Sequence, residues 1–184
     1  MPYRLTKIYT RKGDKGYTKL GKKQISKDDS LIEALGAIDE LNSMIGLVIS
    51  LLNQHQEIED CLTHIQNDLF DLGGELYLPD HVVITADKVT HLEQMLDTWN
   101  KTLPPLEEFL LPRGNPSSAS THVARTICRR AERCLVRLHR QTPLQNDEMI
   151  RYLNRLSDLL FVIARILAHD NGKKELVWEH KERK

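Results

Sequence analysis

The sequence predicts an all-α fold: a five-helix bundle, ferritin-like and up-and-down, with short extended arms near residues 7–10 and 175–178. Three observations support this class. Apolar residues recur at three- and four-residue steps in five segments, and the connections between those segments are short and rich in turn residues. Aromatic residues make up only 5% of the chain, whereas sandwiches and barrels require more aromatic and β-branched residues. A length of 184 residues predicts one domain, 1–184, with the helical bundle at about 30–170.

The first two helices have the clearest patterns. The first is expected from about residue 30, capped by Ser30 or Asp29. Its apolar stripe consists of Leu31, Leu35, Ile38, Leu41, Ile45, Val48 and Leu52. The second is expected from about Glu57 to Leu76, with Pro79 just beyond its end.

Three further helices follow. Thr85 can cap a helix through Trp99, after which two prolines force extended chain. The composition of residues 111–120 predicts a loop, and a fourth helix should then run to about Arg140. A fifth is expected from about Asn146 to His169, where Asn171-Gly172 ends it.

Composition and chain features indicate a cytoplasmic protein without a membrane segment. The three cysteines form no C-x-x-C pair, so reduced thiols are expected. Residues 1–30 lack the apolar core of a signal peptide. The longest apolar run, Leu159 to Leu167, is interrupted by Arg165 and is too short to span a bilayer.

The formal net charge is zero, but the charges are unevenly distributed. Residues 1–27 carry nine Lys or Arg against one acid, and residues 28–80 carry no Lys or Arg. A second basic block, 113–140, holds seven arginines against Glu132. Two such segments could converge on a compact polyanion such as a nucleoside triphosphate, or they could neutralise the acidic half of the same fold or of a neighbouring subunit.

The segment from Thr10 to Thr18 combines two glycines, several cations and hydroxyls. Glycines let successive backbone N–H groups point at an anion, and Lys or Arg supplies positive charge. The spacing differs from that of a P-loop, and taken alone the segment is weak evidence, because most stretches of this kind are ordinary turns.

The fourth predicted helix places Arg125, Arg129, Glu132 and Arg133 on one side. The opposite, apolar side consists of Val123, Ile127, Ala131, Cys134 and Leu138. Guanidiniums bind phosphate oxygens bidentately, so this face could hold a triphosphate. The alternative is a solvated face with helical ion pairs, which is less favourable here because three arginines share one acid.

Other polar groups point to interhelical networks or to a ligand. Asn154, Ser157 and Asp158 lie beside the apolar stripe of the fifth helix, and Asp39 lies on the first. The eight histidines show no metal-binding spacing, and no nucleophilic triad can be assembled.

Taken together, these segments resemble the PduO-type ATP:cob(I)alamin adenosyltransferases from about residue 7 to 178. The run Ile8 to Gly16 resembles the family's N-terminal ATP loop, which spans about residues 8–27 here. Further matches are Ala37–Ser43, Ile65–Leu76, Phe109–Pro112, Ala124–Arg133 and Tyr152–Asp158.

The resemblance implies a homotrimer with active sites between subunits. It implies Mg-ATP as adenosyl donor and cob(I)alamin, or a cob(I)yrinic acid-type precursor, as acceptor, with triphosphate released and adenosylcobalamin formed. A cobalamin reductase or an adenosylcobalamin-dependent enzyme would be a partner, and nucleic acid would not.

The resemblance also implies roles for individual residues. The ATP-binding positions would be Thr10, Arg11, Lys12, Gly13, Asp14, Thr18, Lys27, Arg129, Arg130, Ala131, Glu132, Arg133 and Asn154. Arg125 and Arg129 would clamp the triphosphate, and Asp39 would position Arg125 across the interface. Phe109 would press on the lower corrin face and help displace the axial base. Mg²⁺ would be held through the ATP phosphates, with Glu132 as a protein ligand.

Two features depart from the family pattern, and two rival functions remain. Arg113-Gly114 replaces the usual two glycines, and residues 20–24 are short and lysine-rich, so details of substrate access differ. One rival is a non-catalytic carrier of corrinoid and ATP on the same scaffold. The other is a helical interaction module that docks an acidic partner; neutral net charge and few aromatics argue against nucleic acid.

Overall fold

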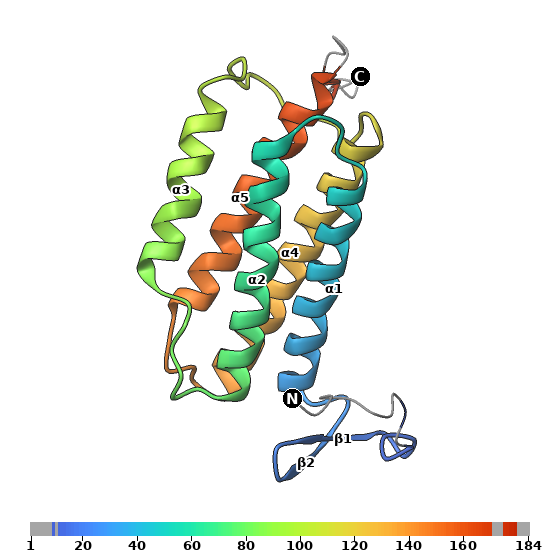
Figure 1. Ribbon diagram of the computed structural model, residues 1–184, viewed down its shortest axis with the longest axis vertical. Coiled ribbons are helices and arrows are strands. Elements are labelled where there is room, and N and C mark those ends of the chain that lie inside the picture. The colour runs from blue at the N-terminus through green and yellow to red at the C-terminus, as the bar shows by residue number, and fades with distance from the viewer. Residues whose placement is uncertain (1–8, 10, 171–174, 180–184) are drawn as a thin grey trace, which may run out of the picture.

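The chain forms a bundle of five helices that alternate in direction (Figure 1), as the sequence predicts. A computed structural model describes residues 9, 11–170 and 175–179. The helices are α1 (Ser30–Ser50), α2 (Gln56–Tyr77), α3 (Ala86–Asn100), α4 (Pro116–Gln141) and α5 (Glu148–Ala168). Within the described ranges, no helix has the length and apolar character needed to cross a membrane.

Two of the helices, α4 and α5, form the centre of the packing. Helix α4 packs against both α1 and α5, and α5 packs in addition against α3, while α2 covers α1. The core is made mainly of leucine and isoleucine, with the fully buried Tyr152 as its largest side chain. The Tyr152 hydroxyl donates a 2.8 Å hydrogen bond to Asp68, so this buried polar group is satisfied.

The start of α4 differs from the prediction that residues 111–120 form a loop. The helix begins at Pro116, because the side chain of Asn115 caps it by accepting a 2.8 Å hydrogen bond from Ser118 N. Proline in the first turn costs nothing there, since its missing N–H would have no intrahelical partner. Asn115 also donates to Leu167 O at 2.7 Å, which ties the start of α4 to the end of α5.

A short hairpin precedes α1, although the sequence had given no convincing sign of strands. Strands β1 (Tyr17–Leu20) and β2 (Lys23–Ser26) pair antiparallel with Leu20 opposite Lys23. The two-residue loop between them begins with Gly21 at φ 60°. Such a loop favours glycine at a position with positive φ, so Gly21-Lys22 was the missed signal.

The C-terminal arm is extended, as predicted. Leu110 forms an isolated antiparallel bridge with Val177, so the arm lies along the segment that joins α3 to α4. Of the predicted N-terminal arm, residues 7, 8 and 10 lie outside the described residues.

Candidate active site

The first part of the candidate site is the arginine face of α4. Arg125 and Arg129 line a hollow of about 260 Å³ together with residues of α3 and α5. Those partners are Leu96, Asn100, Ser157, Asp158, Phe161 and Val162. Arg129 also borders a second hollow of about 590 Å³, which continues along α4 past Glu132 and Arg133 to Arg140. The predicted cluster is therefore one continuous, cation-rich surface.

The buried side of α4 includes Ala131, Cys134 and Leu138, as predicted, but extends further round the helix than the predicted stripe. It centres on Ala124, Cys128, Ala131 and Leu135, whereas Val123, predicted to be inward, is 48% exposed. The reason is that α4 lies between α1 and α5, so the buried face follows both contacts. Ala131 is fully buried, so its side chain is not available to a nucleotide and its place in the motif is one of packing.

Arg125 has an unused hydrogen-bond donor. Its Cζ lies 5.9 Å from the centre of the Phe161 ring, and its buried Nε has no partner among the described residues. Burial, and then the charge of Arg129, lower the pKa of Arg125. A half-buried guanidinium with a free donor and, among the described residues, no ion pair of its own is suited to bind an anion.

Glu132 and Asn154 link α4 to α5 beside this face. Asn154 Nδ2 donates to Glu132 Oε1 at 3.0 Å, and Arg133 donates to Arg129 O at 3.0 Å. Arg130 points elsewhere, since its guanidinium pairs with Glu40 on α1. The structure therefore brings Arg125, Arg129, Glu132 and Asn154 together and separates Arg130 from them.

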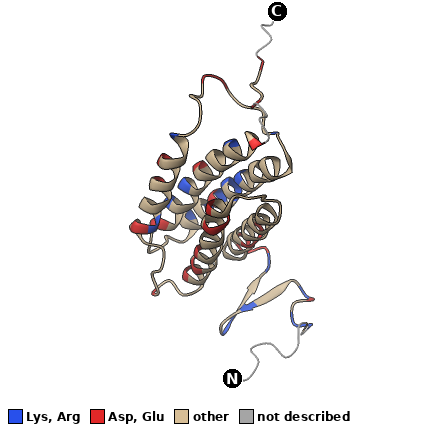
Figure 2. Cartoon of the chain, turned by 45° about the horizontal axis from the view of Figure 1, so that its top comes forward, with Lys and Arg blue, Asp and Glu red and all other residues tan. Residues whose placement is uncertain are grey.

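The second part is the N-terminal loop, whose basic residues precede α1 (Figure 2). Gly16 N donates to Gly13 O and Lys27 N to Gly16 O, so the loop folds back on the end of β2. A Cβ at Gly13 would lie 3.1 Å from Lys27 Nζ, so the ammonium group of Lys27 packs closely against this glycine. A hollow of about 630 Å³ is lined by Lys12, Gly13, Tyr17, Thr18, Lys19, Gln24 and Lys27. Arg11 and Asp14 are exposed beside it, and Thr10 lies outside the described residues.

Within one chain these two parts stay apart. The loop hollow shares no lining residue with either hollow on α4, and the hairpin lies at the end of the bundle beneath α1 (Figure 1). Asp39 is exposed on α1, and among the described residues no ion pair joins it to Arg125.

Phe109 lies in the α3–α4 connection and is 76% exposed. Its ring meets that of Trp178 edge-on, with 6.3 Å between the ring centres. Arg113, the departure from the family pattern, is exposed four residues further along. An exposed aromatic of this size is typical of a surface that binds a large apolar partner.

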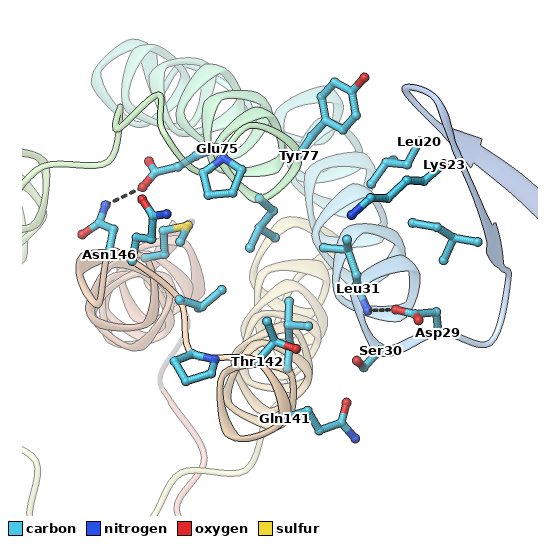
Figure 3. Close-up of a pocket in the computed structure, with 18 of the residues that line it drawn as sticks. Leu20, Lys23, Asp29, Ser30, Leu31, Glu75, Tyr77, Gln141, Thr142 and Asn146 are labelled. Atoms are coloured by element: carbon cyan, nitrogen blue, oxygen red, sulfur yellow. Dashed lines mark hydrogen bonds between the residues drawn. The ribbon is translucent and has the colours of Figure 1, made fainter.

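A hollow of about 820 Å³, which was not predicted, lies between the hairpin, the start of α1, the ends of α2 and α4 and the residues that lead into α5 (Figure 3). Its most buried acid, Glu75, is fully occupied by the fold. The Glu75 carboxylate accepts hydrogen bonds from Val83 N, Ile84 N and the Asn146 side chain. The cations that line this hollow are Lys22 and Lys23 of the hairpin, which are exposed, and we assign the hollow to the packing of the hairpin against the bundle.

The fold and the arginine face define a helical-bundle protein built to bind a compact polyanion. A family model described as "Cobalamin adenosyltransferase" matches residues 8–167. The chain is 46% identical to a cobalamin adenosyltransferase of Cupriavidus metallidurans, covering 97% of each chain. It is 39% identical to a corrinoid adenosyltransferase of Bacillus subtilis, covering 94% of this chain and 92% of the other.

Solved structures agree with these sequence relatives. The chain superposes with a TM-score of 0.87 and 36% identity on a variant PduO-type ATP:corrinoid adenosyltransferase from Lactobacillus reuteri, complexed with cobalamin and ATP. The match covers 94% of this chain and 96% of that one. The chain belongs to the cobalamin adenosyltransferase family.

Proposed function

We propose that this protein is an ATP:corrinoid adenosyltransferase that transfers the 5′-deoxyadenosyl group of ATP to a cob(I) corrinoid. The observation that carries the proposal is the α4 face, where Arg125 and Arg129 border one hollow. Among the described residues neither arginine forms an ion pair, and Asp158, which lines the same hollow, pairs with Arg155. The family membership supplies the reaction class that such a face serves.

In this reaction cobalt(I) is the nucleophile and needs no protein base. Its electron pair forms the Co–C5′ bond, the C5′–O bond breaks, and triphosphate leaves with that bonding pair. The protein must therefore align the two substrates and stabilise charge that builds on the leaving oxygens. Arg125 and Arg129 would perform the second task, since a guanidinium can donate two parallel hydrogen bonds to a phosphate group.

Asn154 and Glu132 order the same face. Because Asn154 donates to one carboxylate oxygen of Glu132, the other oxygen stays available. A single carboxylate oxygen beside substrate phosphates fits what Mg²⁺ usually takes from a protein. We propose that Glu132 and the triphosphate hold Mg²⁺, which would neutralise phosphate charge when bound.

We further propose that the active site is completed by a second copy of the chain, in a homotrimer. The nucleotide residues of the loop, such as Lys12 and Lys27, line a hollow separate from the one that holds Arg125. A neighbouring copy would bring its loop to this arginine face and its Asp39 to Arg125. Phe109, exposed on the α3–α4 connection, would contact the lower face of the corrin ring.

The experiment is anaerobic. Purified protein, Mg-ATP and chemically reduced cob(I)alamin are mixed, and absorbance follows the light-sensitive cobalt–carbon product. Formation of adenosylcobalamin is the expected result. If ATP and corrinoid bind under fully reducing conditions and no product forms, the protein is a carrier and the catalytic roles assigned to the arginines are wrong.

A further inference from the structure

Helix α5 carries a buried arginine that the arginine face does not use. Arg165 interrupts the longest apolar run of the sequence and is only 3% exposed. A guanidinium buried among apolar side chains is costly unless it is paired and hydrogen-bonded. The groups that pair with Arg165 therefore indicate the role of its charge.

Those partners lie outside the bundle core. Arg165 Nε donates to Glu175 Oε1 at 2.7 Å and one terminal nitrogen donates to Glu175 Oε2 at 3.0 Å, which makes a bidentate pair. The same terminal nitrogen donates to Pro104 O at 2.9 Å, and His169 Nε2 lies 3.3 Å from Glu175 Oε2. Burial alone raises the pKa of Glu175, but the hydrogen bonds and charge of Arg165, aided by His169, outweigh it and the pKa is lowered.

Glu175 is the first described residue of the C-terminal arm, 175–179, and the arm holds the segment that carries Phe109. Leu111 N donates to Leu176 O at 2.8 Å, and Trp178 N donates to Phe109 O at 2.7 Å. The arm is thus paired in register with residues 109–111, and the Trp178 ring meets the Phe109 ring. The bidentate pair fixes the start of this register to α5.

We propose that Arg165 and Glu175 are positioning residues for the corrinoid acceptor. Their ion pair anchors the arm, the arm fixes the backbone at Phe109, and the ring of Phe109 is thereby held where it meets the corrin. This inference rests on the proposed function. The simpler alternative is a pair that only stabilises the fold; however, the pair joins the bundle to an arm rather than one helix to another, and buried pairs are best attested as devices that set register.

The test compares Glu175→Gln with Glu179→Gln. Both changes remove one negative charge from the same arm, but Glu179 is exposed and lies outside the ion pair. Two acceptors are used, each supplied in the cobalt(II) state with a mild one-electron reductant. They are cob(II)alamin, whose lower axial base coordinates cobalt and must leave before reduction to cobalt(I), and cob(II)inamide, which lacks that base. Each protein is assayed with both acceptors and for its KM for ATP.

For Glu175→Gln we expect turnover starting from cob(II)alamin to fall about tenfold or more, because Phe109 is misplaced for displacing the axial base that must leave before cobalt is reduced. Cob(II)inamide needs no such displacement, so its turnover should stay near wild type, and the KM for ATP should not change. In cob(II)alamin bound with ATP, the base-off fraction measured by visible absorption should drop. Glu175→Asp, which keeps the charge, should have a base-off fraction between those of Glu175→Gln and wild type. Glu179→Gln should match wild type.

Equal losses with both acceptors, or no loss with either, would overturn the proposal and leave the pair a structural role. If the wild-type protein adenosylates neither acceptor, the proposed function fails, which is a different result from failure of this inference. Thermal melts of each variant separate misplacement from unfolding. Should Glu175→Gln not fold, Glu175→Asp is compared with Glu179→Gln instead, with a smaller loss expected for the same acceptor.

Discussion

The side-chain amide of Asn154 on α5 donates a 3.0 Å hydrogen bond to Glu132 on α4. The two residues are 22 positions apart, and the bond joins the two central helices of the bundle beside the arginine face. Both side chains are accessible to a ligand, so the bond fixes the rotamer of Glu132 without burying it. The Glu132 carboxylate is therefore held in one orientation next to Arg129.

Replacing Asn154 with alanine should weaken ATP binding. Without the amide, Glu132 is free to turn and pair with a neighbouring arginine, which would then be lost to the triphosphate. We expect the KM for ATP to rise about tenfold, which corresponds to the loss of one hydrogen bond to a charged group. Asn67→Ala on α2 is the matched control, since Asn67 is exposed and bonds only Thr63 O of its own helix. Equal KM values for the two variants would contradict the role of Asn154.

Replacing Arg129 with alanine should reduce kcat by about 100-fold or more, because a donor aimed at the leaving triphosphate is lost. The fold should survive, since Arg129 is exposed and bonds no core group through its side chain. Arg151→Ala on α5 removes an arginine whose pair with Glu148 lies within one helix turn, and it should retain activity. Steady-state rates with saturating Mg-ATP make the comparison; an active Arg129→Ala variant would remove the arginine from the mechanism.

Two inactive variants should complement each other if active sites are shared between copies. Lys27→Ala impairs the loop and Arg129→Ala impairs α4. In randomly mixed trimers, about a quarter of the sites combine an intact loop with an intact α4 from the next copy. Co-expression should therefore restore about a quarter of wild-type activity. Sites built within one chain would show no restoration, and sedimentation analysis of the same samples reports the number of copies.

His122 should make the fold sensitive to mild acid. This buried imidazole lies one turn from Arg125, and burial, then the charge of Arg125, lower its pKa to about 4 against an opposing effect of Glu175. A folded-state pKa below the unfolded value of ~6.5 means that the unfolded chain takes up the proton first, so stability falls as pH falls from about 6.5 towards 4. Between pH 7 and pH 5 the loss attributable to His122 should be about 2 kcal/mol.

Urea unfolding at both pH values measures this loss. His122→Gln cannot titrate, so its free energy of unfolding should fall less than that of wild type over the same interval. An identical pH dependence in the two proteins would show that His122 does not titrate on unfolding as its environment requires.

The sequence predicted the helices well because each carries a long apolar stripe. Tertiary packing did not override these helical segments. The start of α4 was misplaced since Ser117, Ser118 and Ser120 suit a loop by composition, whereas the Asn115 cap makes them a first turn. The hairpin was missed because its strands are only four residues long and lysine-rich. Short polar strands leave little periodic signal.

The site was predicted in part. Helical spacing alone put Arg125, Arg129 and Glu132 on one face, and the structure agrees. It could not show that Arg130 turns to Glu40, since that depends on how α1 packs against α4. Arg165 looked only like an interruption of an apolar run, because its partner Glu175 belongs to a segment that pairs across the fold. Pairings of that kind are set by tertiary structure.

The most direct test of adenosyl transfer follows the 5′ carbon itself. ATP labelled at C5′ is incubated anaerobically with the protein, Mg²⁺ and cob(I)alamin, and both products are quantified. We expect one labelled carbon in the corrinoid for each inorganic triphosphate released, with the rate of formation of both products reduced about 100-fold or more in Arg129→Ala. Label that stays in ATP, or that leaves as adenosine or ADP while the corrinoid is unlabelled, would contradict adenosyl transfer.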